Sequence, residues 1–237
     1  MKLRFFLFIF SILIGSYTHL LHAEDIILPS KQIALDGIMA IRFENIARIT
    51  WLHSPENTIT IKGTQEDILD TKVSKDTGII NITYSNSKKY SQKSKLEIIV
   101  KTNSATALTL SNVANFIMIG KYTIPDFSCN MQSTAHADFN LQCTSFLLNT
   151  SASADISVLG RCSNANINAL GVACMDFKDF MSDHVSLTAT GCSKVYAHAE
   201  KSLDIKANGI AKLYYAGDFA INEIQLSGIA QIEKMPW

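Results

Sequence analysis

The sequence predicts an all-β protein whose C-terminal half is a β-helix, or solenoid, of about seven coils. Seven copies of a six-residue pattern recur between residues 111 and 232, about one every nineteen residues. Apolar and polar residues alternate around each copy, and no stretch shows sustained helical periodicity. Repetition at a fixed period of this size is typical of architectures in which each unit buries its apolar face against its neighbours.

Each copy places Gly, Ala or Asn two residues before a central Ala or Ser, and a bulky apolar residue two residues after it. The centres are Ala114, Ala137, Ala154, Ala173, Ser193, Ala211 and Ala230. The small residue predicts a tight corner, because Gly has no Cβ and permits positive φ. The spacing of these glycines does not match a nucleotide-binding loop.

Columns of equivalent residues indicate which side chains face inward. The residues six places before the centres are all apolar, and the next residue is always polar. The apolar column is Met131, Leu148, Ile167, Leu187, Ile205 and Ile224. A second apolar column, two places after the centres, is Phe116, Phe139, Ile156, Met175, Val195, Leu213 and Ile232. Because successive strand residues face opposite sides, each unit supplies at least two strands with an inward face.

The preceding region also favours strands. Short alternating runs separated by turn residues predict strands at 38–43, 49–52, 58–61, 71–73, 79–84, 96–100 and 107–110. The fourth and fifth of these are expected to form a hairpin. Residues 85–95 are polar and rich in lysine, which predicts a mobile loop. We expect residues 24–110 to form an N-terminal β-strand region that packs on and caps the solenoid of residues 111–237.

The first 23 residues have the pattern of a signal peptide. Lys2 and Arg4 precede an apolar run, and Ala23 provides a small residue for cleavage. The expected location is therefore the periplasm, the cell surface or the extracellular space, with no membrane span after cleavage. Cleavage leaves 19 basic and 21 acidic residues, a formal charge of −2. Nucleic-acid binding needs a concentrated basic surface, so no nucleic-acid partner is expected.

The repeated corners, together with the segment from Lys212 to Gly217, resemble the family described as "Putative auto-transporter adhesin, head GIN domain". The resemblance extends over about residues 33–233. It implies a right-handed β-solenoid, an exported bacterial protein and no established catalytic residues.

Three groups of residues are candidates for sites. Tyr196 and Tyr214 share an outward column flanked by Lys194 and Lys212, which suits a glycan or protein partner. The alternative is that the two rings only stabilise exposed strands by cross-strand contact.

Asp138 and Asp155 both follow a centre directly, so we expect them in one outward column. Stacked carboxylates there could bind calcium or provide acid–base chemistry for a polysaccharide lyase. The alternative is a solvated face.

Cys143 and Cys162 both lie eleven residues before a centre, which predicts that they stack on adjacent coils close enough for a disulfide. Cys129 is expected in the core. The histidine and cysteine spacings predict no metal site, and no motif implies a cofactor.

The leading hypothesis is an exported, non-enzymatic, adhesin-like or envelope-associated module that binds a glycan, an envelope protein or a cell-surface protein. The alternatives are a lyase that uses the two carboxylates and a purely architectural envelope component.

Overall fold

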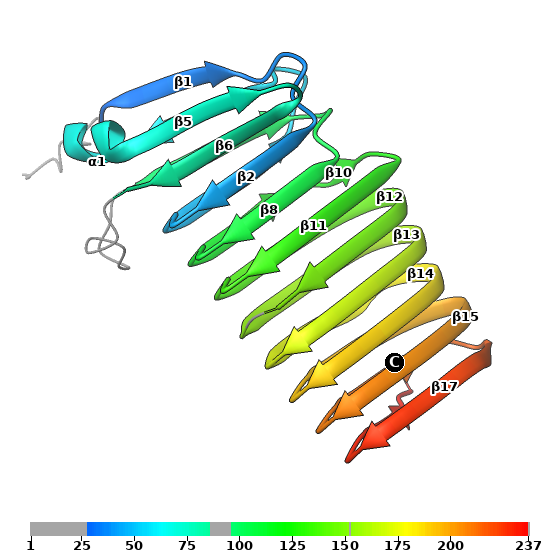
Figure 1. Cartoon of the computed structure of the whole chain (residues 1–237). Coiled ribbons are helices and arrows are strands. Elements are labelled where there is room, and N and C mark those ends of the chain that lie inside the picture. Colours follow the sequence, from blue (N-terminus) through cyan, green and yellow to red (C-terminus); the bar gives the residue numbers. More distant parts are fainter. Residues whose placement is uncertain (1–27, 86–95, 152, 237) are drawn as a thin grey trace, which may run out of the picture.

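A computed structural model of the chain describes residues 28–85, 96–151 and 153–236. The predicted fold class is confirmed: the protein is nearly all strand and forms a β-solenoid of about seven turns. Figure 1 shows the coils stacked as an elongated ladder. The expected signal peptide (residues 1–23) and nearly all of the expected loop (residues 86–95) lie outside the described residues. No helix in the described ranges is long and apolar enough to cross a membrane.

Each coil contributes one strand segment to each of two layers. The first layer contains β5 (Thr71–Asp76), β6 (Ile79–Tyr84), β2 (Ala40–Glu44), β8 (Ala107–Ser111), β11 (Asp126–Gln132), the second halves of β12 (His136–Thr150), β13 (Ala154–Gly171), β14 (Ala173–Gly191) and β15 (Lys194–Gly209), and β17 (Ala220–Gly228).

The second layer is built in the same way from the other side of each coil. It contains β1 (Ser30–Ala34), β4 (Thr58–Lys62), β7 (Glu97–Thr102), β3 (Arg48–His53), β9 (Asn115–Ile119), the first halves of β12 to β15, β16 (Lys212–Ala216) and β18 (Gln231–Lys234). The short β10 (Tyr122–Thr123) pairs with β12.

The repeats stack in parallel, but the N-terminal strands do not follow chain order. The coil of β2 and β3 lies between the coil of β6 and β7 and the coil of β8 and β9. The ladders of the repeats therefore continue without interruption into strands as early as residue 40.

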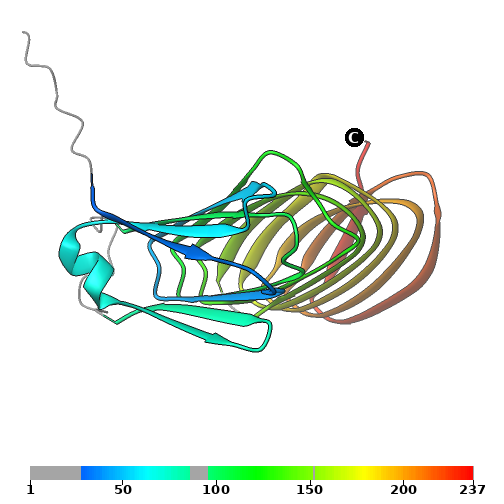
Figure 2. The same cartoon turned by 90° about the horizontal axis from the view of Figure 1, so that it is seen from above.

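The N-terminal end of the ladder finishes in antiparallel strands. β5 pairs with β6 as the expected hairpin, and β1 and β4 end the second layer. A helix, α1 (Gln65–Asp70), connects β4 to β5 and lies at the end away from the last coil (Figure 2). Its Thr64 and Asp67 form a capping box. The sequence does not indicate α1, because a helix of six residues is too short to show a period.

The interior is filled by the apolar members of the alternation. Trp51, Phe116 and Phe139 are buried, and the rings of Phe116 and Phe139 lie 5.0 Å apart. The corners predicted at Asn112 and at the glycines are confirmed, whereas the corner predicted at Ala135 lies at Ser133. Gly171, Gly191, Gly209 and Gly228 stack on one another with φ between 80° and 115°, and Asn112 and Ser133 take the same place in earlier coils with φ of 51° and 53°.

The predicted register of one repeat is wrong by two residues. His136 pairs with both Asn115 and Asp155, so the centre of that repeat is Ala135 and not Ala137. Consequently Cys129, not Met131, stacks on Leu148, and Ala137, not Phe139, stacks on Ile156.

The error has a physical reason. Ala occurs at both 135 and 137, and a shift of two residues leaves every side chain on the same face of its strand. The alternation could therefore predict which residues are buried but not which partner each one contacts. In every repeat before the last coil, the residues of the two predicted apolar columns are buried, and so is Cys129.

Candidate functional site

The two tyrosines and their flanking lysines come together on the outer face of the second layer. Tyr196 pairs with Tyr214, and Lys194 pairs with Lys212. The tyrosine rings stack with their centroids 4.9 Å apart and 19° between their planes. The Nζ atom of Lys194 lies 4.9 Å from the centroid of Tyr196 and 5.5 Å from that of Tyr214. We call these four residues together with Lys178 the tyrosine–lysine patch.

Lys178 was not singled out in the sequence. Its Nζ atom lies 4.8 Å from the Tyr196 ring centroid and 2.8 Å from a carboxylate oxygen of Asp176. The hydrogen bond with Asp176 raises the pKa of Lys178, and the contact with Tyr196 raises the pKa of Lys194. Both ammonium groups are therefore charged at neutral pH. The sequence could have indicated Lys178, because it lies two residues after Asp176, which is the register partner of Tyr196.

The predicted stacking of the two carboxylates is wrong, as a consequence of the register error. Asp138 pairs with Ser157, whereas Asp155 pairs with His136 and Cys174. The two acids are instead linked through an imidazole. The Nε2 atom of His136 lies 3.0 Å from Asp138, and its Nδ1 atom lies 3.8 Å from Asp155. Within the described part of the chain, no three His, Cys, Asp or Glu side chains are placed to hold a metal ion.

Cys143 and Cys162 lie side by side where β12 and β13 bend between the layers. They are register partners, and both are buried free thiols in the structure. The hydrogen bond from Cys143 lowers the pKa of the Cys162 thiol. The Sγ atom of Cys162 also lies 3.1 Å from the carbonyl oxygen of Asn164. The disulfide stays a prediction. The exposed Cys174 and Cys192 lie on adjacent coils without being register partners.

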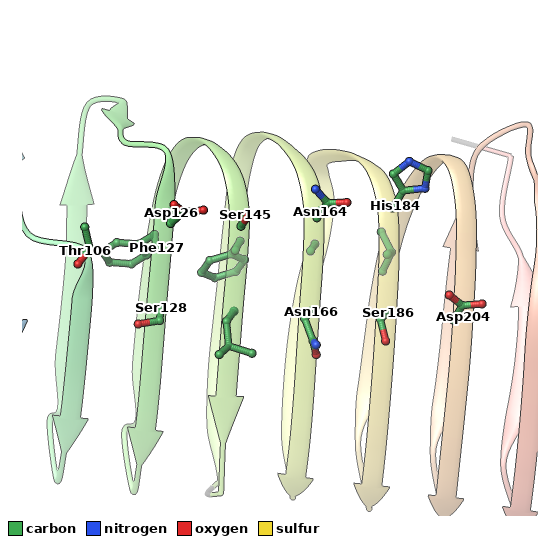
Figure 3. A pocket seen from close by; sticks show the side chains of 14 residues that line it. Thr106, Asp126, Phe127, Ser128, Ser145, Asn164, Asn166, His184, Ser186 and Asp204 are labelled. Atoms are coloured by element: carbon green, nitrogen blue, oxygen red, sulfur yellow. The ribbon is translucent and has the colours of Figure 1, made fainter.

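The outer face of the first layer contains a groove that no sequence motif indicates. It has a volume of about 530 Å³ and crosses β11 to β15 (Figure 3). Its polar residues recur once per coil, so the sequence pattern that could have indicated the groove is a pair of outward columns of Ser, Asn, Asp and His. The columns were overlooked because no single residue in them forms a known motif.

These features define the class of the protein as a two-layer β-solenoid with distinct surfaces on its two outer faces. The chain belongs to the family described as "Putative auto-transporter adhesin, head GIN domain", whose model matches residues 39–218. A search of curated proteins finds no relative of this chain by sequence.

Solved structures share the fold. The structure of a putative adhesin from Bacteroides fragilis NCTC 9343 superimposes with a TM-score of 0.79 at 16% identity, covering 88% of this chain and 97% of that one. A putative adhesin from Parabacteroides merdae ATCC 43184 gives 0.67 at 15% identity, covering 89% and 97%. A protein described as a putative lipid binding protein, from Parabacteroides distasonis ATCC 8503, gives 0.64 at 14% identity, covering 89% and 98%.

Proposed function

We propose that this protein is an exported, non-enzymatic binding module of adhesin type, which contacts a glycan or a cell-surface protein through the tyrosine–lysine patch. The observation that carries this proposal is the pair of stacked rings with the ammonium groups of Lys178 and Lys194 close to them. Membership of a family described as "Putative auto-transporter adhesin, head GIN domain", and the fold shared with structures described as putative adhesins, support the same class of function.

The chemistry of the patch favours a partner with an apolar face and acidic or hydroxyl groups. Tyr196 and Tyr214 are partly buried, so their rings are held by the ladder and lose little rotamer freedom on binding. Lys194 and Lys212 are exposed. Their ammonium groups would pair with acidic groups at the edge of the contact, while the rings pack against the apolar part.

The test is binding of the secreted protein to glycan arrays and to intact cells. The double variant Tyr196→Ala/Tyr214→Ala should weaken binding by about tenfold or more, because two aromatic contacts are lost. Tyr196→Phe/Tyr214→Phe keeps the stack and should retain most of the binding. Gln231→Ala, an exposed position in the Lys212 column on the last coil, is the matched control. Binding that is unchanged in the double alanine variant would remove the patch from consideration.

Export and the role of the first 23 residues belong to the same proposal. Cells that produce the full chain should release or display a protein that begins at Glu24, and replacing the apolar run at residues 5–14 with polar residues should keep it in the cytoplasm. N-terminal sequencing of the exported protein checks this.

A polysaccharide lyase is the second candidate, because His136 lies within reach of both Asp138 and Asp155. An imidazole oriented by a carboxylate is a suitable base for proton abstraction. A lyase releases an unsaturated product that absorbs ultraviolet light. Such a product from acidic polysaccharides, lost in His136→Ala, would favour the enzyme over the adhesin. A purely architectural role would instead appear as altered envelope integrity after deletion, with no binding to glycans or cells.

A further inference from the structure

The groove of the first layer lies on the face opposite the tyrosine–lysine patch. Two outward rows of side chains line it, each with about one residue from every coil. The row nearer the bend contains Asp126, Ser145, Asn164 and His184. The second row contains Ser128, Leu147, Asn166, Ser186 and Asp204. Figure 3 shows the labelled members of both rows along successive strands.

The next outward row of this layer contains Asn130, Asn149 and Asn168, whose side chains form hydrogen bonds from coil to coil. Asn168 donates to Asn149, and Asn149 donates to Asn130, each over 2.9 Å. The hydrogen-bonding groups of these amides are therefore occupied by neighbouring coils. In the groove, Asn166 accepts a hydrogen bond from Asn168 over 3.2 Å, and His184 lies 2.8 Å from the hydroxyl of Ser202. The side chains of Ser145, Asn164 and Ser186, by contrast, have no hydrogen-bond partner among the described residues. Their hydroxyl and amide groups are available to a ligand.

The groove has a clear charge preference. Among the residues that the structure describes, no Lys or Arg lines it, and Asp126 and Asp204 lie toward its two ends (Figure 3). A polyanion would meet these carboxylates without a compensating cation, so anionic ligands are disfavoured. A neutral or cationic ligand meets no such repulsion.

The lining also has a chemical preference. Serine hydroxyls and asparagine amides both donate and accept hydrogen bonds, which matches a ligand rich in hydroxyl groups. Leu147, 36% exposed, is the apolar member of the second row, and the buried residues between the two rows are also apolar: Phe127, Phe146, Ala165 and Val185. An acyl chain would leave the hydroxyl and amide groups without partners, which is unfavourable. The volume is in the range of small-ligand sites.

We infer that this groove binds a linear, neutral or amino-sugar-containing glycan that runs along the solenoid axis. The polar groups repeat at the strand spacing of about 4.8 Å, so successive sugars meet equivalent hydroxyl and amide groups on successive coils. This site is independent of the tyrosine–lysine patch, because the two lie on opposite layers.

The test measures binding of the mature protein to three hexasaccharides by titration calorimetry: an uncharged glucan, chitosan and polyguluronate. The first or second should bind, and polyguluronate should not. Ser186→Trp fills the groove from an exposed position and should weaken binding by about tenfold or more. The double variant Asn164→Ala/Asn166→Ala should also weaken it, because two amide groups are lost.

Two controls distinguish binding in this groove from a general effect of substitution and from binding at the patch. Leu170→Trp, exposed on the same strand as Asn166 but outside the groove, should bind as the unmodified protein does. Tyr196→Ala/Tyr214→Ala should also leave hexasaccharide binding unchanged, so failure of the patch and failure of the groove are distinguishable.

Three results would overturn the inference. These are no binding of either non-acidic hexasaccharide, equal binding by Ser186→Trp and the unmodified protein, or tighter binding of a fluorescent fatty acid that Ser186→Trp abolishes. The last result would assign the groove to a lipid.

Discussion

Gly191 lies at a corner where the chain approaches the preceding coil closely. Its φ is +107°, and a Cβ atom at this position would collide with the carbonyl oxygen of Gly171. The corner therefore needs Gly for two reasons, the backbone conformation and the absence of space.

We expect Gly191→Ala to lower the free energy of unfolding by about 3 kcal/mol or more, as the strain and the collision act together. Gly37→Ala is the matched control, since Gly37 also has positive φ (+70°) but would place its Cβ in open space. That variant should lower the free energy of unfolding by only about 1 kcal/mol. Urea denaturation of both variants measures the difference, and equal losses would show that the close approach of the coils is unimportant.

Tyr84, the last residue of β6, makes the stability of the fold dependent on alkaline pH. Its hydroxyl donates to Asp67 over 3.0 Å, and burial followed by this hydrogen bond raises the pKa of Tyr84 from 10.0 to about 12. A group whose pKa is raised on folding stabilises the folded state while it is protonated. This contribution is complete below pH 10 and is lost as the pH rises through about 12.

The unfolding free energy of the unmodified protein should therefore fall more steeply between pH 10 and 12 than that of Tyr84→Phe, which cannot titrate at this position. Taking the difference between the two proteins removes the contribution of other tyrosines, including Tyr122, whose pKa is also raised by burial. Parallel pH profiles would contradict the assignment.

At the scale of the element, the pairing of β12 with β13 brings Cys143 and Cys162 together. In an oxidising medium, we expect these thiols to give up two protons and two electrons to a disulfide oxidant such as oxidised glutathione, and to form a bridge between coils. A bridge that closes a loop of this length stabilises by about 3 kcal/mol.

Peptide mass spectrometry without reduction should find the linked peptides, and Cys143→Ser should lose the added stability. Cys129 is the internal control, because its neighbours in the ladder are Leu108 and Leu148 and it should remain a thiol. Alkylation of both Cys143 and Cys162 after unfolding without reductant would show that no bridge forms.

The strands themselves illustrate what a sequence of this kind can and cannot predict. Alternation and small corner residues depend on neighbouring positions, so the coils, the hairpin and the buried columns could be predicted. The exact partner of His136 could not, because two registers bury the same residues. The placement of β2 and β3 between later strands depends on contacts over long sequence separations, which no local pattern records. The groove arises only when several coils are stacked, so it too needed the structure.

At the scale of the whole molecule, the two ends of the ladder differ. Antiparallel strands and α1 finish the N-terminal end, whereas Ile224 and Leu226 in the last coil are 44% and 47% exposed although they continue inward columns. In a stack whose units contact only their neighbours, stability is lowest where one neighbour is missing.

Hydrogen exchange should therefore be fastest in β17 and β18 and slowest in β13 and β14. The β5–β6 hairpin provides the comparison at the N-terminal end, where β6 is paired on both sides, and β6 should exchange more slowly than β17. Uniform protection along the ladder would mean that the protein opens only as a single unit.

The displaced coil of β2 and β3 has a consequence for the order in which the chain can fold. Both of its neighbours are made from residues that are synthesised later, between 79 and 119. As the polypeptide emerges, β2 and β3 must wait with both edges unpaired, whereas each later repeat can add at once to the one before it. Assembly is therefore expected to nucleate beyond the first hundred residues and to reach the beginning of the chain last.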